Sequence, residues 1–159
     1  MVRTGIGYDV HQLAAGEKLV IGGIEIPALS GSVGYSDGDG LIHAIVDALL
    51  GAAALGDIGQ FFPSDDNKWE NVNSGQFLIS VTNQIRSANF EISNIDATIL
   101  LQKPKLSNFI YQMRCNLATH MQLDESQLSI KATTTDHLGY IGRGEGWAVQ
   151  AICTLQSID

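Results

Sequence analysis

Residues 36–56, SDGDGLIHAIVDALLGAAALG, carry the clearest helix signal in the chain. Helical spacing relates the apolar positions of this stretch, which are Leu41, Ile42, Ile45, Val46, Leu49 and Leu50. Ser36 followed three residues later by Asp39 approximates a capping box, and carboxylates suit the positive end of a helix. The stretch therefore predicts a helix that begins close to residues 36–39 and stops near Gly56.

Strand patterns flank this helix on both sides. Before it, residues 2–8 predict a short strand, and residues 18–26 predict a small N-terminal hairpin that turns at Gly22 and Gly23. After it, we expect a long loop over 57–73, helices over 74–88 and 106–121, strands over 92–102, 128–134 and 147–156, and a glycine-rich loop over 135–146. This alternation predicts an α/β or α+β fold with helices on one face of a sheet.

The length and composition favour one globular domain over residues 1–159. Lys and Arg number 9 and Asp and Glu number 17, so the formal net charge is −8, which argues against nucleic acid or an anionic membrane surface as the main partner. Apolar residues make up 45% of the chain, which is enough for a core. Charged residues are only 16%, which suggests that part of the surface is buried in an oligomer.

Nothing in the sequence predicts export or a membrane span. The N-terminal residues lack an apolar region of signal-peptide length, and the apolar stretch 41–55 is too short and too polar to cross a bilayer. The two cysteines, Cys115 and Cys153, form no C-x-x-C motif. We therefore expect a reduced, intracellular protein.

Three residues in the first third of the chain form a candidate metal centre. Asp9 and His11 are two residues apart, so on an extended segment both side chains point to one face. His43 could supply a third ligand from the predicted helix, and two histidines with one carboxylate are typical of catalytic zinc and non-haem iron sites. Asp47, four residues after His43, could hold the outer imidazole N–H. The same spacing also fits a surface Asp-x-His pair and a helix-cap histidine.

Two loops have the chemistry of a polyol site and a phosphate site. Residues 56–66, GDIGQFFPSDD, combine acids, glycines and an aromatic pair, which suits a sugar alcohol but also an ordinary turn. Residues 131–136, KATTTD, and 142–146, GRGEG, offer hydroxyls, amides and a guanidinium to phosphate oxygens. Plain β propensity explains the threonines equally well.

Taken in order, these segments resemble one enzyme family. The motifs are DVH at 9–11, SDGD at 36–39, HAIVDALLGAAALGDIG at 43–59, FP at 62–63, PK at 104–105, KATTT at 131–135 and GRGEG at 142–146. The ordered set is similar to the 2-C-methyl-D-erythritol 2,4-cyclodiphosphate synthases of the non-mevalonate isoprenoid pathway, over essentially the whole chain. The resemblance implies a homotrimer with active sites at subunit interfaces and a four-stranded sheet in a ferredoxin-like layout. It also implies a bacterial cytoplasmic protein, or the mature form of a plastid protein.

The resemblance assigns roles to individual residues. By this analogy, zinc is bound by Asp9, His11 and His43. The methylerythritol phosphate part of the substrate is expected at Asp57, Gly59, Phe62, Pro63, Ser64, Asp65 and Asp66, with Ser36 nearby. Asp9, His11, Tyr35 and Ile58 are expected to bind the substrate as well. The cytidine diphosphate part is expected at residues 101–107, which include Leu101, Lys105 and Leu106, and at Ala132, Thr133 and Thr134. Thr135, Asp136, Tyr140 and Arg143 are expected to bind the substrate as well. The expected catalytic residues are Thr134, Tyr35 and Asp57.

Further roles follow from the same analogy. Asp136 stands where the family usually has Glu, a ligand of a second divalent ion, Mg²⁺ or Mn²⁺, between the α- and β-phosphates. Arg143 and Glu145 match residues near a central trimer cavity that in some relatives accepts isoprenoid diphosphates. Tyr35 replaces the usual histidine before SDGD, a residue thought to stabilise phosphate charge. A tyrosine hydroxyl still donates a hydrogen bond but carries no positive charge at neutral pH.

The implied activity is that of a phosphorus–oxygen lyase acting by intramolecular phosphoryl transfer. The 2-phosphate of 4-diphosphocytidyl-2-C-methyl-D-erythritol 2-phosphate attacks its own β-phosphorus, and CMP leaves. Two other functions are compatible with the motifs. One is zinc-assisted hydrolysis with Asp57 as the base. The other is a non-enzymatic trimer that binds metal or prenyl diphosphate, with Tyr35 marking lost catalysis.

Overall fold

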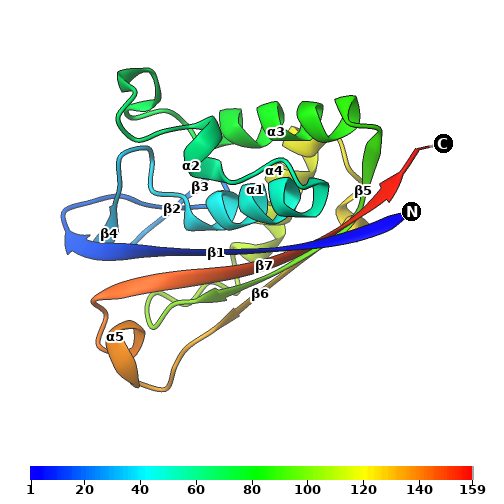
Figure 1. The fold of residues 1–159 in the computed structure, drawn as a ribbon. Helices are drawn as coiled ribbons and strands as arrows, with labels where there is room; N and C mark the ends of the chain where they lie inside the picture. Colours follow the sequence, from blue (N-terminus) through cyan, green and yellow to red (C-terminus); the bar gives the residue numbers. More distant parts are fainter. Residues whose placement is uncertain (159) are drawn as a thin grey trace.

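Five strands form one mixed sheet in the computed structural model, which describes residues 1–158 (Figure 1). The strands are β1 (Val2–Ala15), β4 (Ser30–Val33), β5 (Phe90–Leu100), β6 (Leu128–Thr133) and β7 (Gly146–Ser157). Their order across the sheet is β4-β1-β7-β5-β6. The β5–β6 pair is parallel, and the other neighbouring pairs are antiparallel. A separate hairpin of β2 (Leu19–Ile21) and β3 (Ile24–Ile26) forms as predicted.

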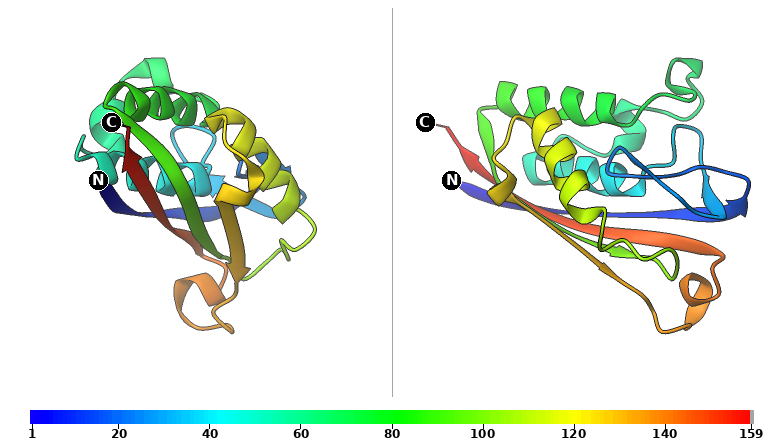
Figure 2. Two further views of the ribbon diagram at one scale, coloured as in Figure 1. Left: turned by 90° about the vertical axis from the view of Figure 1, so that its right-hand side faces the viewer. Right: turned by 180° about the vertical axis from the view of Figure 1, so that it is seen from behind.

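Three long helices cover one face of the sheet (Figure 2). They are α1 (Gly40–Ala53), α3 (Gly75–Ser87) and α4 (Ile110–Met121), and their buried apolar side chains join those of the sheet in the core. Shorter turns occupy the segments expected to be loops: α2 (Ile58–Phe61), α5 (Gly139–Gly142) and a 3-10 turn at Asn67–Trp69. A further 3-10 turn, at Glu125–Gln127, precedes β6. Within residues 1–158, no helix has both the length and the apolar content needed to cross a membrane.

The sheet has five strands where the resemblance implied four. The extra strand, β4, has the sequence SGSV, which lacks a run of β-branched or aromatic residues, so its extended shape comes from pairing with the far end of β1. For the same reason β1 continues to Ala15 instead of ending at Tyr8. The main elements run β1, α1, α3, β5, α4, β6, β7. Two successive strands therefore end the chain, whereas a ferredoxin-like layout places them between the helices.

The cap of α1 is Asp39, not Ser36. The buried Asp39 carboxylate accepts hydrogen bonds from the backbone N–H groups of Ile42 (3.1 Å), Gly22 (2.9 Å) and Gly23 (2.6 Å). Burial and the nearby charge of Asp37 raise the pKa of Asp39 to about 6, although these donors act to lower it. One side chain thus caps α1 and fixes the β2–β3 hairpin against it.

Close contact between α1 and β1 fixes how near side chains on these two elements lie to each other. Gly5 and Gly7 on β1 face α1, and a Cβ atom at either position would overlap the carbonyl oxygen of Ala48 or Ala44. Only glycine allows the helix to lie this near the strand backbone. The start of α1 is therefore held directly over the middle of β1 (Figure 1).

Candidate active site

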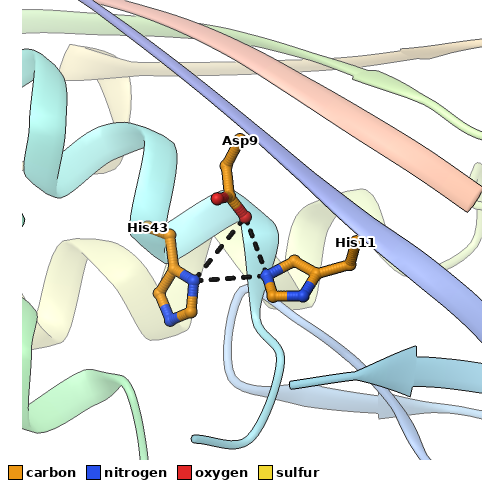
Figure 3. Close-up of side chains that lie close together, drawn as sticks. All are labelled: Asp9, His11 and His43. Carbon is orange, nitrogen blue, oxygen red and sulfur yellow. Dashed lines mark hydrogen bonds and ion pairs between the residues drawn. The ribbon is translucent and has the colours of Figure 1, made fainter. Parts of the chain in front are cut away.

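Asp9, His11 and His43 meet at the start of α1, where their side chains point toward one another (Figure 3). Asp9 and His11 leave β1 on the face covered by the helices, because alternate residues of a strand share a face. Asp9 Oδ2 lies 2.8 Å from His11 Nε2 and 3.6 Å from His43 Nδ1, and the two nitrogens are 3.3 Å apart. The structure brings together the three residues predicted to bind a metal.

The donors and their spacing suit a divalent cation. Zinc lies about 2.0–2.1 Å from histidine nitrogen, so two ligands at a tetrahedral angle stand about 3.3 Å apart. The distance between the two histidine nitrogens equals this value, and the two distances to Asp9 Oδ2 lie on either side of it. Asp9 Oδ2 is buried, and unless the facing nitrogen of His11 or His43 carries a proton it has no hydrogen-bond partner among the residues that the structure describes. Because a buried oxygen without a partner is costly, a cation between the three residues would satisfy it.

The close contacts also shift two pKa values. Burial raises the pKa of Asp9, but its contacts with His11 and His43 outweigh burial and lower this pKa to about 2. Burial lowers the pKa of His11, but the Asp9 carboxylate outweighs burial and raises this pKa above its ordinary value. The Asp9 carboxylate therefore stays ionised at neutral pH and attracts positive charge, whether a proton on His11 or a cation.

Each histidine contacts a polar group on its outer side. His11 Nδ1 lies 3.1 Å from the carbonyl oxygen of Val33, which can only accept a hydrogen bond. His43 Nε2 lies 3.0 Å from Ser74 Oγ and 3.2 Å from Ser36 Oγ. Outer partners of this kind orient metal-binding imidazoles.

Asp47 does not hold His43, contrary to the expectation from helix spacing. Its carboxylate accepts a hydrogen bond from the backbone N–H of Ile58 at 2.7 Å and so fixes the start of α2. The His43 ring turns toward α3, where Ser74 lies. Ser74 is 31 residues further along the chain, so no local pattern in the sequence points to it.

A cavity of about 240 Å³ adjoins the metal group, and we call it the metal-side cavity. Predicted substrate residues that line it are Asp9, His11, Tyr35, Ser36, Ile58, Gly59, Phe62 and Ser64. Its other lining residues are His43, Trp69 and Phe77, and the two aromatic residues among them have no counterpart in the sequence prediction. The Phe62 ring stacks on Phe77 with centroids 4.3 Å apart and makes a T-shaped contact with Trp69 at a centroid distance of 5.0 Å.

Four other residues predicted for this part of the substrate do not line the cavity. Pro63, Asp65 and Asp66 belong to the loop that carries Phe62 and Ser64. Asp66 accepts a hydrogen bond from the backbone N–H of Lys68 at 3.0 Å. Asp57 caps α2 and accepts bonds from the side-chain amide and backbone N–H of Gln60, which lower its pKa.

A second cavity, of about 540 Å³, lies at the C-terminal ends of β5 and β6, and we call it the strand-end cavity. Predicted residues that line it are Leu101, Lys105, Leu106, Ala132, Thr133 and Thr134. It shares no lining residue with the metal-side cavity. β7 and β5 separate β1 from β6, which is three strand spacings, or about 14 Å. One chain therefore holds the two predicted halves of the substrate site apart.

The remaining predicted residues line neither cavity. Thr135 donates a hydrogen bond to the Leu138 carbonyl at 2.7 Å, and the exposed Asp136 lies 3.4 Å from the Thr134 hydroxyl. The Tyr140 hydroxyl lies 3.3 Å from that of Tyr8 on β1. The Arg143 guanidinium donates two hydrogen bonds to Glu145, at 2.9 and 3.2 Å.

Comparison with known proteins identifies the family of this fold and site. The sequence model of the YgbB family matches residues 2–156. The chain belongs to the YgbB family. The protein of Alkaliphilus oremlandii named 2-C-methyl-D-erythritol 2,4-cyclodiphosphate synthase is 51% identical over 154 residues, which cover 97% of this chain and 98% of that protein. The Salinibacter ruber protein of the same name is 47% identical over 156 residues, covering 98% and 99%. The resemblance carried by the ordered motifs is confirmed.

Solved structures of YgbB relatives have the same fold. The bifunctional IspDF of Campylobacter jejuni matches with a TM-score of 0.96 and 42% identity, covering 100% of this chain and 43% of that longer one. The Plasmodium falciparum IspF, solved as a CDP complex, matches with a TM-score of 0.88 and 34% identity, covering 99% and 97%. The arrangement of strands and helices described above is therefore that of the YgbB family.

Proposed function

We propose that the chain is a 2-C-methyl-D-erythritol 2,4-cyclodiphosphate synthase of the non-mevalonate isoprenoid pathway. Relatives 51% and 50% identical over nearly the whole chain have that name. The observation that carries the proposal is the Asp9, His11 and His43 group at the wall of a small polar and aromatic cavity. We place the reaction in the bacterial cytoplasm, because these relatives come from bacteria.

The chemistry requires orientation and charge neutralisation rather than a protein nucleophile. An oxygen of the 2-phosphate, already an anion, forms a bond to the β-phosphorus. The bond from this phosphorus to the oxygen shared with the α-phosphate breaks, and CMP leaves with the electron pair. Holding the two phosphates in reach of each other can supply about 7–11 kcal/mol of the barrier. Asp9, His11 and His43 would hold a zinc ion, which when bound supplies Lewis-acid polarisation of a phosphate oxygen.

The metal-side cavity suits the methylerythritol phosphate part of the substrate. The hydroxyls of Tyr35 and Ser36 can donate hydrogen bonds to phosphate, and Ile58, Gly59 and Phe62 offer backbone and apolar contact to the carbon chain. Partial desolvation and the acidic neighbours Glu70, Asp66 and Asp65 raise the pKa of Tyr35. Its phenol therefore stays protonated at neutral pH and remains a donor. Asp57, beside this cavity at the start of α2, offers a carboxylate that can accept hydrogen bonds from polyol hydroxyls.

The strand-end cavity suits the cytidine diphosphate part. Lys105 supplies a positive charge there, and the hydroxyls of Thr133 and Thr134 can donate to phosphate oxygens. We assign Thr134 to the polarisation of the reacting phosphates. Asp136 would hold Mg²⁺ or Mn²⁺, because hard cations prefer oxygen ligands, and such an ion would neutralise diphosphate charge. The CDP complex of the Plasmodium falciparum relative supports a cytidine nucleotide site in the family.

Because the two cavities lie apart in one chain, we place the complete site between subunits of a homotrimer. The sheet face away from the long helices carries exposed apolar side chains, Ile6, Tyr8 and Val10 on β1 and Ile152 on β7. Ile6 is 62% exposed, and a large apolar patch on a single chain marks an interaction surface. A neighbouring copy on this face could complete the metal-side cavity with its own strand-end cavity. Arg143 and Glu145 are candidates for holding an isoprenoid diphosphate in the centre of such a trimer.

Subunit mixing tests the shared site. We would co-express a His43→Ala chain, defective in the metal group, with a Thr134→Ala chain, defective in the strand-end cavity, and measure CMP release. If each site draws its halves from two subunits, random mixing restores about a quarter of the sites. If each chain holds its own complete site, the mixed trimers stay as inactive as either variant alone, and the interface assignment is wrong.

A further inference from the structure

Asp37 and Ser74 lie on the Nε2 side of His43, away from Asp9 and His11, and neither residue lines the metal-side cavity. Ser74 is fully buried at the start of α3, with its Oγ 3.0 Å from His43 Nε2. The same hydroxyl contacts Asp37 Oδ1. The other Asp37 oxygen accepts a hydrogen bond from the Ser74 backbone N–H at 2.8 Å. Asp37 and Ser74 therefore form a continuous chain of polar contacts that ends on the outer nitrogen of His43.

Ser74 does not perform the usual task of a serine at its position. It is the N-cap residue of α3, where a serine side chain ordinarily accepts a hydrogen bond from the first turn of the helix. Its side chain makes no such bond. The hydroxyl is used toward Asp37 and His43 instead, which argues for a role outside the stability of α3.

The direction of each bond follows from the donors available. A carboxylate accepts hydrogen bonds, so the single proton of the Ser74 hydroxyl is donated to Asp37. The Ser74 oxygen then has only lone pairs to offer His43, and His43 Nε2 must carry the ring proton. His43 Nδ1 is left with its lone pair directed at Asp9 and His11, as a metal ligand requires (Figure 3).

We propose that Asp37 and Ser74 are positioning residues that hold His43 in the tautomer able to bind the metal. The inference rests on the proposed metal binding at Asp9, His11 and His43, and it does not depend on the reaction catalysed. The Val33 carbonyl selects the matching tautomer of His11, because His11 Nδ1 must donate to it. Both rings are thus oriented by partners on the side away from Asp9. His11 Nε2 and His43 Nδ1, the nitrogens that face Asp9, present their lone pairs to the same point.

Ser36 does not provide the same selection. Its Oγ lies 3.2 Å from His43 Nε2, but this is the one side-chain contact that its hydroxyl makes among the described residues. A hydroxyl whose proton is not directed elsewhere can either donate to Nε2 or accept from it, so it is compatible with both tautomers. Removing Ser36 should therefore weaken metal binding less than removing Ser74.

The tautomer can be read directly in metal-free protein. Two-bond ¹⁵N–¹H correlation spectra of histidine-labelled protein, at a mildly alkaline pH where imidazoles are neutral, distinguish the two forms. The His43 signals are assigned by their loss in His43→Ala. We expect the Nε2–H form in the wild type and a mixture of forms in Ser74→Ala. A wild-type ring in the Nδ1–H form would overturn the proposal without any variant being needed.

Zn²⁺ affinity, measured by competition with a chelating dye, is the second readout. Ser74→Ala should bind Zn²⁺ about 10–100-fold more weakly than the wild type, the usual effect of removing an outer partner of a ligand. Ser74→Thr restores the hydroxyl and should recover most of the affinity. The control is Thr82→Val, which removes another buried hydroxyl of α3, one that donates within its own helix to Leu78 at 2.7 Å.

Failure of the tautomer proposal and failure of the metal assignment give different results. Equal Zn²⁺ affinity in Ser74→Ala and Thr82→Val, with both variants folded, would contradict the proposal. A wild-type protein that binds no Zn²⁺ would contradict the metal assignment instead, and the tautomer spectrum of the metal-free protein would still decide the inference.

Discussion

Gly7 on β1 lies directly against Ala44 on α1: a Cβ atom at Gly7 would stand 1.8 Å from the Ala44 carbonyl oxygen. Ala44 follows His43, and Asp9 is two residues after Gly7 on the same face of β1. This backbone contact therefore determines how far the helix ligand stands from the strand ligands. The metal group depends on a glycine that touches no ligand.

Replacement of this glycine tests that dependence. Gly7→Ala should lower the free energy of unfolding by about 3 kcal/mol, because the backbone of α1 must move to admit a methyl group. It should also weaken Zn²⁺ binding by separating His43 from Asp9. Urea unfolding and dye competition measure the two effects.

Gly51→Ala is the matched control, since Gly51 is exposed on the same helix and the nearest atom to its added Cβ is 4.0 Å away. It should raise the free energy of unfolding by about 0.5–1 kcal/mol through helix propensity and leave Zn²⁺ affinity unchanged. Similar losses of stability in both variants would show that the close approach at Gly7 has no special role.

Removal of one ligand should abolish tight metal binding. His43→Ala leaves one histidine and one carboxylate, and we expect its Zn²⁺ affinity to fall by more than about 100-fold, since the metal loses a direct bond to the protein. Metal analysis after dialysis against a chelator measures the retained zinc. The exposed His137 lies outside the metal group, and His137→Ala should retain zinc as the wild type does. One zinc per subunit in His43→Ala would refute the ligand assignment.

Tyr35 is the departure from the family pattern at the metal-side cavity. Tyr35→His should keep or raise kcat, because a partly protonated imidazole adds positive charge beside the phosphates. Tyr35→Phe should lower kcat by about 10-fold, the effect of one lost hydrogen bond to a charged group. Tyr111→Phe, at a 64% exposed tyrosine of α4, is the control. A large loss in Tyr35→His would mean that the phenol has a task that imidazole cannot perform.

Removal of the Asp39 cap should lower the free energy of unfolding more than removal of an exposed helix cap. Asp39→Ala leaves the backbone N–H groups of Gly22, Gly23 and Ile42 without their acceptor in a buried position, so we expect a loss of about 1–3 kcal/mol in the free energy of unfolding. Thermal or urea unfolding measures this loss. Asp124→Ala, which removes the exposed cap of a 3-10 turn, should cost about 0.5 kcal/mol. Equal losses would indicate that the hairpin is held by other contacts.

Much of the fold follows from local sequence patterns. The helical spacing of apolar residues in α1, such as Ile45 and Leu49, and the strand patterns of β5, β6 and β7 predict the right elements with boundaries shifted by a few residues. β4 could not be predicted, because its extended shape is imposed by β1 and not by its own residues. The local pattern favours Ser36 over Asp39 as the cap of α1, since the hairpin that Asp39 holds is distant from it along the chain.

The candidate site was predictable to the extent that it follows strand and helix geometry. The i, i+2 spacing of Asp9 and His11 places both ligands on one face, and the structure adds His43 to them. The residues behind the ligands were not predictable, because Ser74 reaches His43 from another helix and Asp47 is engaged by Ile58. The separation of the two cavities also depends on strand order, which no motif encodes.

In the proposed reaction the substrate closes on itself and releases CMP. The most direct measurement is ³¹P NMR of the products formed from 4-diphosphocytidyl-2-C-methyl-D-erythritol 2-phosphate by zinc-loaded protein with Mg²⁺ present. We expect one CMP signal and two mutually coupled signals from the two phosphorus atoms of a cyclic diphosphate. CMP together with a linear product would show metal-assisted hydrolysis, and an unchanged substrate spectrum would show a protein that binds without catalysing. Either result would contradict the proposed cyclisation.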